Sequence, residues 1–227
     1  MNLLLDNVGD GKRFVKLTNA RLREFGAQLK FHPGIPELFT EMKDAVQQHQ
    51  LSSPGIQFYV VSGGLEEIIR GSSITKYLSG VWGCQFAEEN GEIRHIKKLV
   101  SFTEKTKYLF YINKELGPNA GAYAVNEKID LKNRRVPFEN MIYLGDALTD
   151  VPCFSLVEGN EGRAFGVFNP ENPDSPKKAW EKLVAPKRVT TMNAPKYGPT
   201  DELGALLRAH VQSLCFRLDG RTGAVRE

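Results

Sequence analysis

A short apolar segment that runs directly into two carboxylates constrains this chain more than any other part of its sequence. Met141–Leu144 is mostly apolar and predicts a short buried strand, which Gly145 ends. Asp146 then leaves the carboxyl end of that strand, and Asp150 falls in the first turn of a following helix, with Thr149 as the expected N-cap. Ligands bind at this edge of open α/β sheets. Two carboxylates there predict a Mg²⁺ site, and a Gly-Asp turn with a capping carboxylate is the alternative interpretation.

The composition is that of an ordinary globular protein. The 227 residues suit one large domain or one domain with a small appendage, and 41% hydrophobic with 25% charged residues is typical of soluble proteins. The net charge of +3 is small and the basic residues are dispersed, so nucleic acid is not an expected partner. No apolar run reaches transmembrane length, so no membrane partner is expected. Three widely spaced cysteines form no metal or disulfide pattern, which favours the cytoplasm: Cys84, Cys153 and Cys215.

A second apolar segment runs into a glycine-rich turn. Ile56–Val61 is rich in β-branched and aromatic residues and predicts a strand, which Ser62-Gly63-Gly64 is expected to break. A helix is expected over Leu65–Arg70. Backbone N–H groups at the start of such a helix, together with the serine hydroxyl, would suit a phosphate. A plain strand-to-helix turn with a serine cap explains the same residues equally well.

The next segment predicts a hairpin and then a helix with a lysine near its start. Gly80–Phe86 and Ile93–Val100 have strand character, and Asn90-Gly91 between them is a strong hairpin signal. A helix is expected over Thr103–Leu116, with the threonine as its cap. Lys105 lies in the first turn, where a cation opposes the helix dipole. Either solvent or an anionic group is therefore expected to stabilise it.

The order of these segments predicts the fold class. From residue 34 on, the order is helix, strand, helix, hairpin, helix, strand, helix, strand, helix, which is typical of an α/β protein with a mostly parallel sheet. Residues 1–33 have no strong strand pattern and are expected to be helical, with a boundary at His32–Pro36. A last helix is expected to end near Leu214, before a frayed tail over Arg217–Glu227.

Three of these segments together resemble motifs of the haloacid dehalogenase (HAD)-like hydrolase superfamily, most of whose members are Mg²⁺-dependent phosphatases. Val60-Val61-Ser62-Gly63 resembles the second motif, Thr103-Glu104-Lys105-Thr106 the third, and Gly145–Asp150 the fourth. The resemblance covers about residues 34–192. It implies a three-layer α/β/α Rossmannoid core over residues 34–227.

The first motif of the superfamily, Asp-x-Asp after an N-terminal strand, is missing. It supplies the nucleophile and the general acid, and Asp6, Asp10 and Asp219 all lack a second carboxylate two residues on. In many members a helical cap lies between the first and second motifs, and residues 1–33 look like the remnant of such a cap. The nucleophile strand is then expected upstream of Met1. A sheet without that internal strand is expected to self-associate through its unpaired edge.

The resemblance implies a Mg²⁺-dependent phosphatase that acts on a small phosphorylated metabolite, here inactive because the nucleophile is missing. The residues implied to bind the phosphoryl group are Ser62, Gly63 and Lys105. The catalytic residues implied are Lys105 and Asp146, and the metal ligands are Asp146 and Asp150. Lys107 is the alternative to Lys105. Two other functions remain open: a non-catalytic protein of the same fold that binds an anion or a partner, and another chemistry of the superfamily, such as that of a phosphomutase or dehalogenase.

Overall fold

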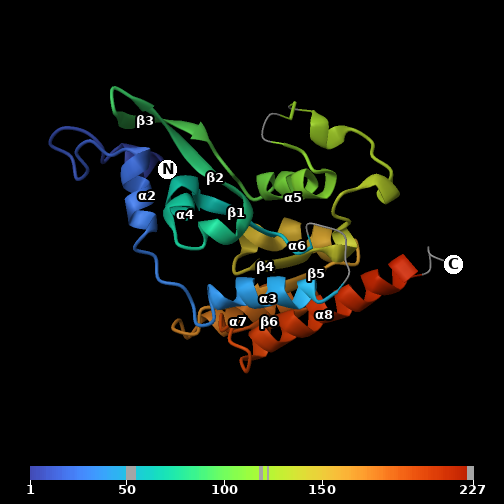
Figure 1. Cartoon of the computed structure of the whole chain (residues 1–227). Coiled ribbons are helices and arrows are strands. Elements are labelled where there is room, and N and C mark those ends of the chain that lie inside the picture. Colours follow the sequence, from blue (N-terminus) through green and yellow to red (C-terminus); the bar gives the residue numbers. More distant parts are fainter. Residues whose placement is uncertain (50–54, 118–119, 122, 224–227) are drawn as a thin grey trace. The chain divides into compact units, whose positions relative to one another are not determined.

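The protein is a mixed α/β protein with two three-stranded sheets, in which parallel pairing predominates. This computed structural model describes residues 1–49, 55–117, 120–121 and 123–223. The chain forms two compact units (Figure 1). The first unit combines Met1–Phe31 with Gln57–Ser101, and the second combines His32–Ile56 with Phe102–Glu227. The sequence predicts one boundary, between residues 33 and 34. In the structure the chain passes from one unit to the other three times, after Phe31, Ile56 and Ser101.

The sheet of the first unit is built around the predicted hairpin. Its strands are β1 (Phe58–Leu65), β2 (Leu78–Glu89) and β3 (Glu92–Lys98), in that order. β1 pairs with β2 in parallel, and β2 pairs with β3 antiparallel. Asn90 and Gly91 have φ angles of 53° and 75°. These angles suit the two-residue turn that matches the twist of the flanking strands, so the hairpin prediction is confirmed.

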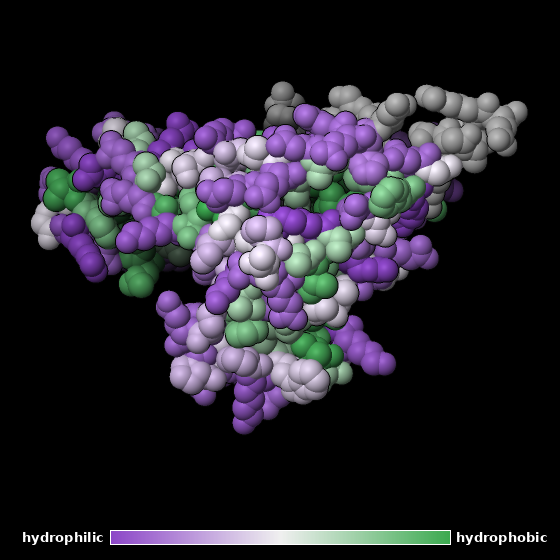
Figure 2. Space-filling view, turned by 60° about the horizontal axis from the view of Figure 1, so that its bottom comes forward, coloured by the Kyte–Doolittle hydropathy of each residue, from purple (hydrophilic) through white to green (hydrophobic). Residues whose placement is uncertain are grey.

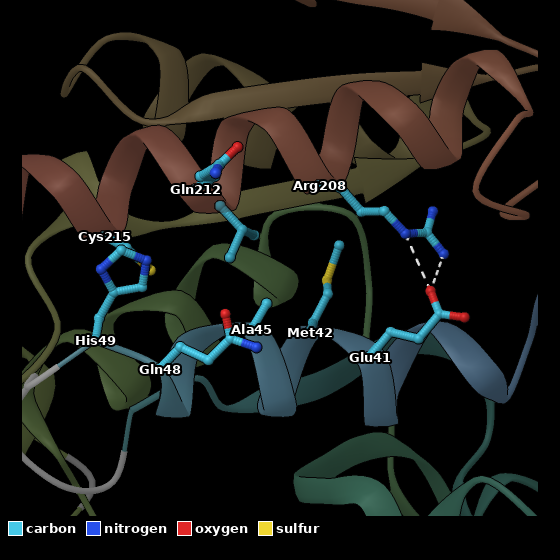
Figure 3. Close-up of a pocket in the computed structure, with 9 residues that line it drawn as sticks. Glu41, Met42, Ala45, Gln48, His49, Arg208, Gln212 and Cys215 are labelled. Atoms are coloured by element: carbon cyan, nitrogen blue, oxygen red, sulfur yellow. Dashed lines mark hydrogen bonds and ion pairs between the residues drawn. The ribbon is translucent and has the colours of Figure 1, made fainter.

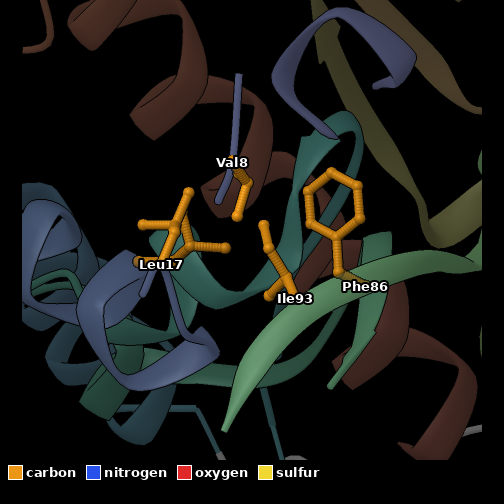
Figure 4. Close-up of a cluster of buried hydrophobic side chains, with 5 residues drawn as sticks. Val8, Leu17, Phe86 and Ile93 are labelled. Atoms are coloured by element: carbon orange, nitrogen blue, oxygen red, sulfur yellow. The ribbon is translucent and has the colours of Figure 1, made fainter. Parts of the chain in front are cut away.

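The N-terminal segment packs onto this hairpin. Its two helices are short, α1 (Asn2–Leu5) and α2 (Asn19–Gly26), so the expectation of a mainly helical segment was wrong. The reason is tertiary packing, which stabilises irregular chain: a buried cluster joins the segment to the hairpin (Figure 4). Its members are Val8, Leu17, Leu22, Phe86 and Ile93. α2 also contacts α4 (Glu66–Gly71) so closely that a Cβ on Gly26 would lie 2.0 Å from the Ile68 carbonyl oxygen.

The second unit contains an all-parallel sheet in the order β4, β5, β6. The strands are β4 (Ile142–Gly145), β5 (Arg163–Val167) and β6 (Thr191–Asn193). The helices are α3 (Glu37–Gln47), α5 (Glu104–Lys114), α6 (Val151–Glu158), α7 (Ser175–Ala179), which continues as a π-helix over Trp180–Val184, and α8 (Glu202–Gly223). Short 3₁₀ turns cover Thr75–Tyr77 in the first unit and Ala124–Asn126, Leu131–Asn133, Phe138–Asn140 and Leu148–Asp150 in the second.

Helices cover both faces of β5. Ala164 clusters with Phe154 of α6, whereas the next residue, Phe165, contacts His210 of α8. Successive side chains of a strand point to opposite faces, so α6 and α8 lie on opposite sides of the sheet. α8 packs on α3 through buried residues spaced four apart, Leu203, Leu207, Val211 and Cys215. The helix continues past its predicted end at Leu214, because the last of these side chains is still buried.

Hydrophilic side chains predominate on the face of the molecule in Figure 2, with apolar side chains in small groups between them. Within the described residues, no helix has both the length and the apolar character needed to cross a membrane.

The stability of the protein should fall as the pH drops below about 6.5, the ordinary pKa of histidine. His210 lies against Phe165, and its Nε2 atom is buried without a hydrogen-bond partner among the described residues. Burial lowers the pKa of His210, the charges of Arg163 and Arg217 lower it further, and Glu158 opposes this. Below the ordinary pKa, the unfolded chain therefore binds a proton that the folded chain does not, which favours unfolding until the pH reaches the folded-state pKa.

Thermal unfolding at about pH 7.5 and about pH 5.5 measures this effect. His210→Gln should lose less stability on acidification than the wild-type protein. His32→Gln is the matched control, because the side chain of His32 is exposed; this variant should lose as much stability as the wild type. An equal loss in all three proteins would exclude His210 as the cause.

Candidate functional site

The candidate site lies at the carboxyl end of β4. This strand ends at Gly145, Asp146 follows it, and the 3₁₀ turn Leu148–Asp150 leads into α6. A Cβ on Gly145 would lie 2.7 Å from the Cγ atom of Asp150. A side chain at position 145 would therefore displace Asp150. The strand, the glycine and the acidic turn that the sequence predicts are all present.

The carboxylate of Asp150 is buried and fully engaged. Its side chain is 6% exposed. The Oδ1 atom accepts hydrogen bonds from Lys105 Nζ and from the Tyr143 hydroxyl, both at 2.7 Å. The Oδ2 atom accepts a hydrogen bond from the backbone N–H of Ala147 at 3.3 Å. These donors compensate for the loss of water around a buried charge.

Lys105 is the lysine that reaches the acidic turn. Its side chain is 9% exposed, and its ammonium group also lies 3.3 Å from the hydroxyl of Thr149. Of the two explanations that the sequence left open for Lys105, solvent or an anionic group, the structure shows the second: the anionic group is Asp150, 45 residues further along the chain. Lys107 instead pairs with Glu104 at 3.0 Å, within its own helix. This geometry favours Lys105 over Lys107.

Neither of the two predicted cap residues, Thr103 and Thr149, caps its helix through its side chain. Thr103 occupies the N-cap position of α5, but its side chain makes no capping hydrogen bond. Thr149 lies inside the 3₁₀ turn, and Asp150 is the N-cap residue of α6. The hydroxyl of Thr149 is used by Lys105 instead. A tertiary contact has replaced the local one that the sequence pattern suggests.

Two tyrosines belong to this region and were not predicted. The hydroxyl of Tyr143 contacts Asp150, and burial, with the charges of Cys153 and Asp150, raises the pKa of Tyr143. Burial and the charge of Asp146 raise the pKa of Tyr197. The signal for Tyr143 was present in the sequence, because a tyrosine in a buried strand needs a partner for its hydroxyl. Burial also raises the pKa of Cys153 to about 11, so this thiol is protonated and is not a nucleophile at neutral pH.

Asp146 differs from Asp150 in its exposure. It is exposed to solvent, and within the described part of the chain it makes no hydrogen bond or ion pair. No group of three or more potential metal ligands is present among the described His, Cys, Asp and Glu residues. An Mg²⁺ ion needs only one or two carboxylates when water and phosphate oxygens complete its coordination. The exposed carboxylate of Asp146 therefore fits such an ion directly, whereas Asp150, whose oxygens are engaged, could contribute only through water.

Ser62 and Gly63 lie in the first unit, whereas Lys105, Asp146 and Asp150 lie in the second. Their convergence on one anion remains a prediction. The expected end of the strand at the Ser-Gly-Gly sequence was only partly right: the register with β2 shifts irregularly between Val61 and Leu65, but β1 continues to Leu65, which pairs with Cys84. The hydroxyl of Ser62 accepts a hydrogen bond from the N–H of Gly64 at 3.0 Å.

A second buried carboxylate, Glu66, follows β1 directly. It accepts hydrogen bonds from Lys98 Nζ at 2.6 Å, Arg70 Nε at 2.8 Å and the N–H of Gly83 at 3.0 Å. Burial raises the pKa of Glu66, but these hydrogen bonds outweigh it, so the net pKa is lower than usual. The sequence analysis missed this residue. Its contacts join α4 to β2 and β3, which gives it a clear structural role.

None of the three candidate nucleophiles lies at the carboxyl end of a described strand. Asp6 ends α1, and Asp10 lies in an exposed turn. Asp219 lies on α8, where its Oδ2 atom is 2.6 Å from His49 Nδ1. The geometry gives none of them the position that an attacking carboxylate of this fold requires.

A groove of about 250 Å³ lies between α3 and α8, apart from the predicted site residues (Figure 3). The ion pair of Glu41 with Arg208 borders it, and His49 and Cys215 line it further along. Arg208 Nη1 also donates to the carbonyl oxygen of Tyr197 at 3.0 Å. The groove is therefore linked to the loop that carries Tyr197.

No family model matches the chain, and no solved structure matches it. A protein of Borreliella burgdorferi, described only as uncharacterized, is 32% identical over 160 residues. The match covers 63% of this chain and 54% of that protein, so the chain spans about half the length of this relative.

Loss of the charge on Lys105 should destabilise the fold more than loss of the charge on Lys107. Lys105→Met leaves Asp150 as a buried carboxylate without its cation, at an expected cost of about 3–5 kcal/mol. Lys107→Met is the matched control, because its partly exposed pair with Glu104 is worth less than about 1 kcal/mol. Urea unfolding at neutral pH measures both changes. An equal loss of unfolding free energy in the two variants would mean that Lys105 does not stabilise the buried charge of Asp150.

Proposed function

We propose that this protein is a HAD-like hydrolase of the Mg²⁺-dependent phosphatase type, built for a small phosphorylated metabolite, whose described residues hold the metal and phosphate side of the site but no nucleophile. The observation that supports this proposal is the buried pair of Lys105 and Asp150 beside the exposed Asp146, at the carboxyl end of a parallel strand. The three residues come from the two motifs that lie in the second unit. Ligand sites of parallel α/β sheets occur at this edge.

In this proposal each residue has a distinct role. Asp146 is the direct Mg²⁺ ligand, because its carboxylate is exposed and has no hydrogen-bond partner among the described residues. Asp150 supports the metal through water, since both of its oxygens already accept hydrogen bonds. Bound Mg²⁺ would withdraw charge from the phosphoryl oxygens. Lys105 holds a phosphoryl oxygen with an N–H.

The attacking carboxylate is the missing part of the proposed mechanism. Asp6, Asp10 and Asp219 lie on helices or in a turn, away from strand ends. β4 pairs with β5 along one edge, and no described strand pairs with its other edge. We propose that this edge accepts a further strand and can support self-association.

A non-catalytic protein of the same fold is the second candidate function. The placement of the three candidate nucleophiles favours it, because binding an anion needs no nucleophile. In either case we propose a cytoplasmic location. The three cysteines are free and buried, which suits a reducing compartment.

Asp146→Asn should weaken Mg²⁺ binding about tenfold or more, because it removes the charge of the proposed ligand. Titration calorimetry with Mg²⁺ in the presence of inorganic phosphate measures the effect. Asp130→Asn is the control, because it makes the same change at an exposed position of the same unit. Equal Mg²⁺ affinity in the wild type and Asp146→Asn would remove Asp146 from the site.

The chain alone should not hydrolyse p-nitrophenyl phosphate, with or without Mg²⁺. The loss of a nucleophile in a covalent mechanism costs several orders of magnitude in rate, which binding of metal and phosphate cannot restore. A phosphatase assay with Mg²⁺ tests this expectation. Robust turnover that is abolished by Asp6→Asn or Asp10→Asn would reveal a displaced nucleophile.

A further inference from the structure

One oxygen of Asp150 accepts two short hydrogen bonds from different elements. Lys105 Nζ comes from α5 and the Tyr143 hydroxyl from β4, each at 2.7 Å from Oδ1. The ring of Tyr143 packs edge-on against Phe154 with 5.6 Å between centroids. The ring packing limits the motion of the hydroxyl, so Tyr143 presents it to Asp150 from a fixed direction.

We propose that Tyr143 is a positioning residue for Lys105. Its hydroxyl fixes the orientation of the Asp150 carboxylate, which in turn fixes the ammonium group. The ammonium has three N–H donors, and two of them are accounted for by Asp150 and by the hydroxyl of Thr149. The direction of the third is then determined. The functional part of this inference rests on the proposed function, in which the third N–H holds a phosphoryl oxygen.

A simpler explanation of the hydrogen bond between Tyr143 and Asp150 is that a buried hydroxyl needs a hydrogen-bond partner. The two explanations differ in what happens to Lys105. On the simpler explanation, the contact only gives the Tyr143 hydroxyl a partner. Removing the hydroxyl then leaves Asp150 bound by Lys105 and by the N–H of Ala147, and the ammonium group does not move. If Tyr143 fixes the carboxylate, the ammonium group changes its environment.

The experiment compares the wild-type chain with Tyr143→Phe, which keeps the ring and removes only the hydroxyl. The ¹H–¹⁵N signal of the Lys105 ammonium group reports its environment, and calorimetry with inorganic phosphate and Mg²⁺ reports binding. Tyr111→Phe is the matched control, because Tyr111 lies on α5 and contacts Tyr108 rather than Asp150. Tyr143→Phe should shift or broaden the Lys105 signal and weaken phosphate binding about tenfold, as expected for loss of a supporting contact. Tyr111→Phe should change neither.

An unchanged Lys105 signal in Tyr143→Phe would overturn the positioning role. A shifted signal in a chain whose wild type binds no phosphate would support the positioning role and count against the proposed function. The wild type supplies a test that needs no variant, because a hydroxyl fixed on Asp150 should give a proton signal in slow exchange with water. Rapid exchange of the Tyr143 hydroxyl proton would also overturn the proposal.

Discussion

The buried ion pair of Lys105 and Asp150 is the interaction on which the second unit depends. Removing two charges from water is costly, and attraction between them compensates only when the remaining hydrogen-bonding capacity is also satisfied. Here Tyr143, Thr149 and the N–H of Ala147 satisfy all of it except one N–H of the Lys105 ammonium group. The pair thereby joins the start of α5 to the end of β4 and the start of α6. It also requires a glycine at position 145, because a side chain there would occupy the space of the Asp150 carboxylate.

The first unit contains a similar arrangement, and the comparison separates structure from function. Glu66 follows a strand and is buried. Like Asp150, it accepts hydrogen bonds from a lysine and from a backbone N–H. The difference lies in the neighbouring groups. Glu66 has a second cation, Arg70. Asp150 lies beside Asp146, whose exposed carboxylate has no partner among the described residues. A buried carboxylate and lysine are therefore not sufficient evidence of a site, and the exposed carboxylate beside them carries the functional argument.

Local patterns predicted the parts of the fold in which local chemistry is decisive. The Asn90-Gly91 turn, the short strand before Gly145 and the helix that begins near Lys105 all follow from residue type and spacing. The predictions that failed were overruled by tertiary contacts. Leu65 stays in β1 because it pairs with Cys84, and α8 passes Leu214 because Cys215 is buried and Arg217 bonds to Asn140. Such contacts join residues far apart in sequence, and one sequence without a template cannot reveal them.

The same limit applies to the candidate site. The sequence placed Lys105, Asp146 and Asp150 at element ends, and parallel strands bring such ends to one edge. It did not reveal that Asp150 is occupied by protein donors while Asp146 is not. Lys105, Tyr143 and the N–H of Ala147 all donate to Asp150, and Tyr143 is the side-chain donor that the sequence analysis missed, because it was counted only as a residue of an apolar strand. A carboxylate with both oxygens engaged has little capacity left for a metal ion, whereas one in solvent retains all of it. The division between a carboxylate held by protein donors and one available to a ligand therefore depends partly on residues outside the acidic motif, Lys105 and Tyr143.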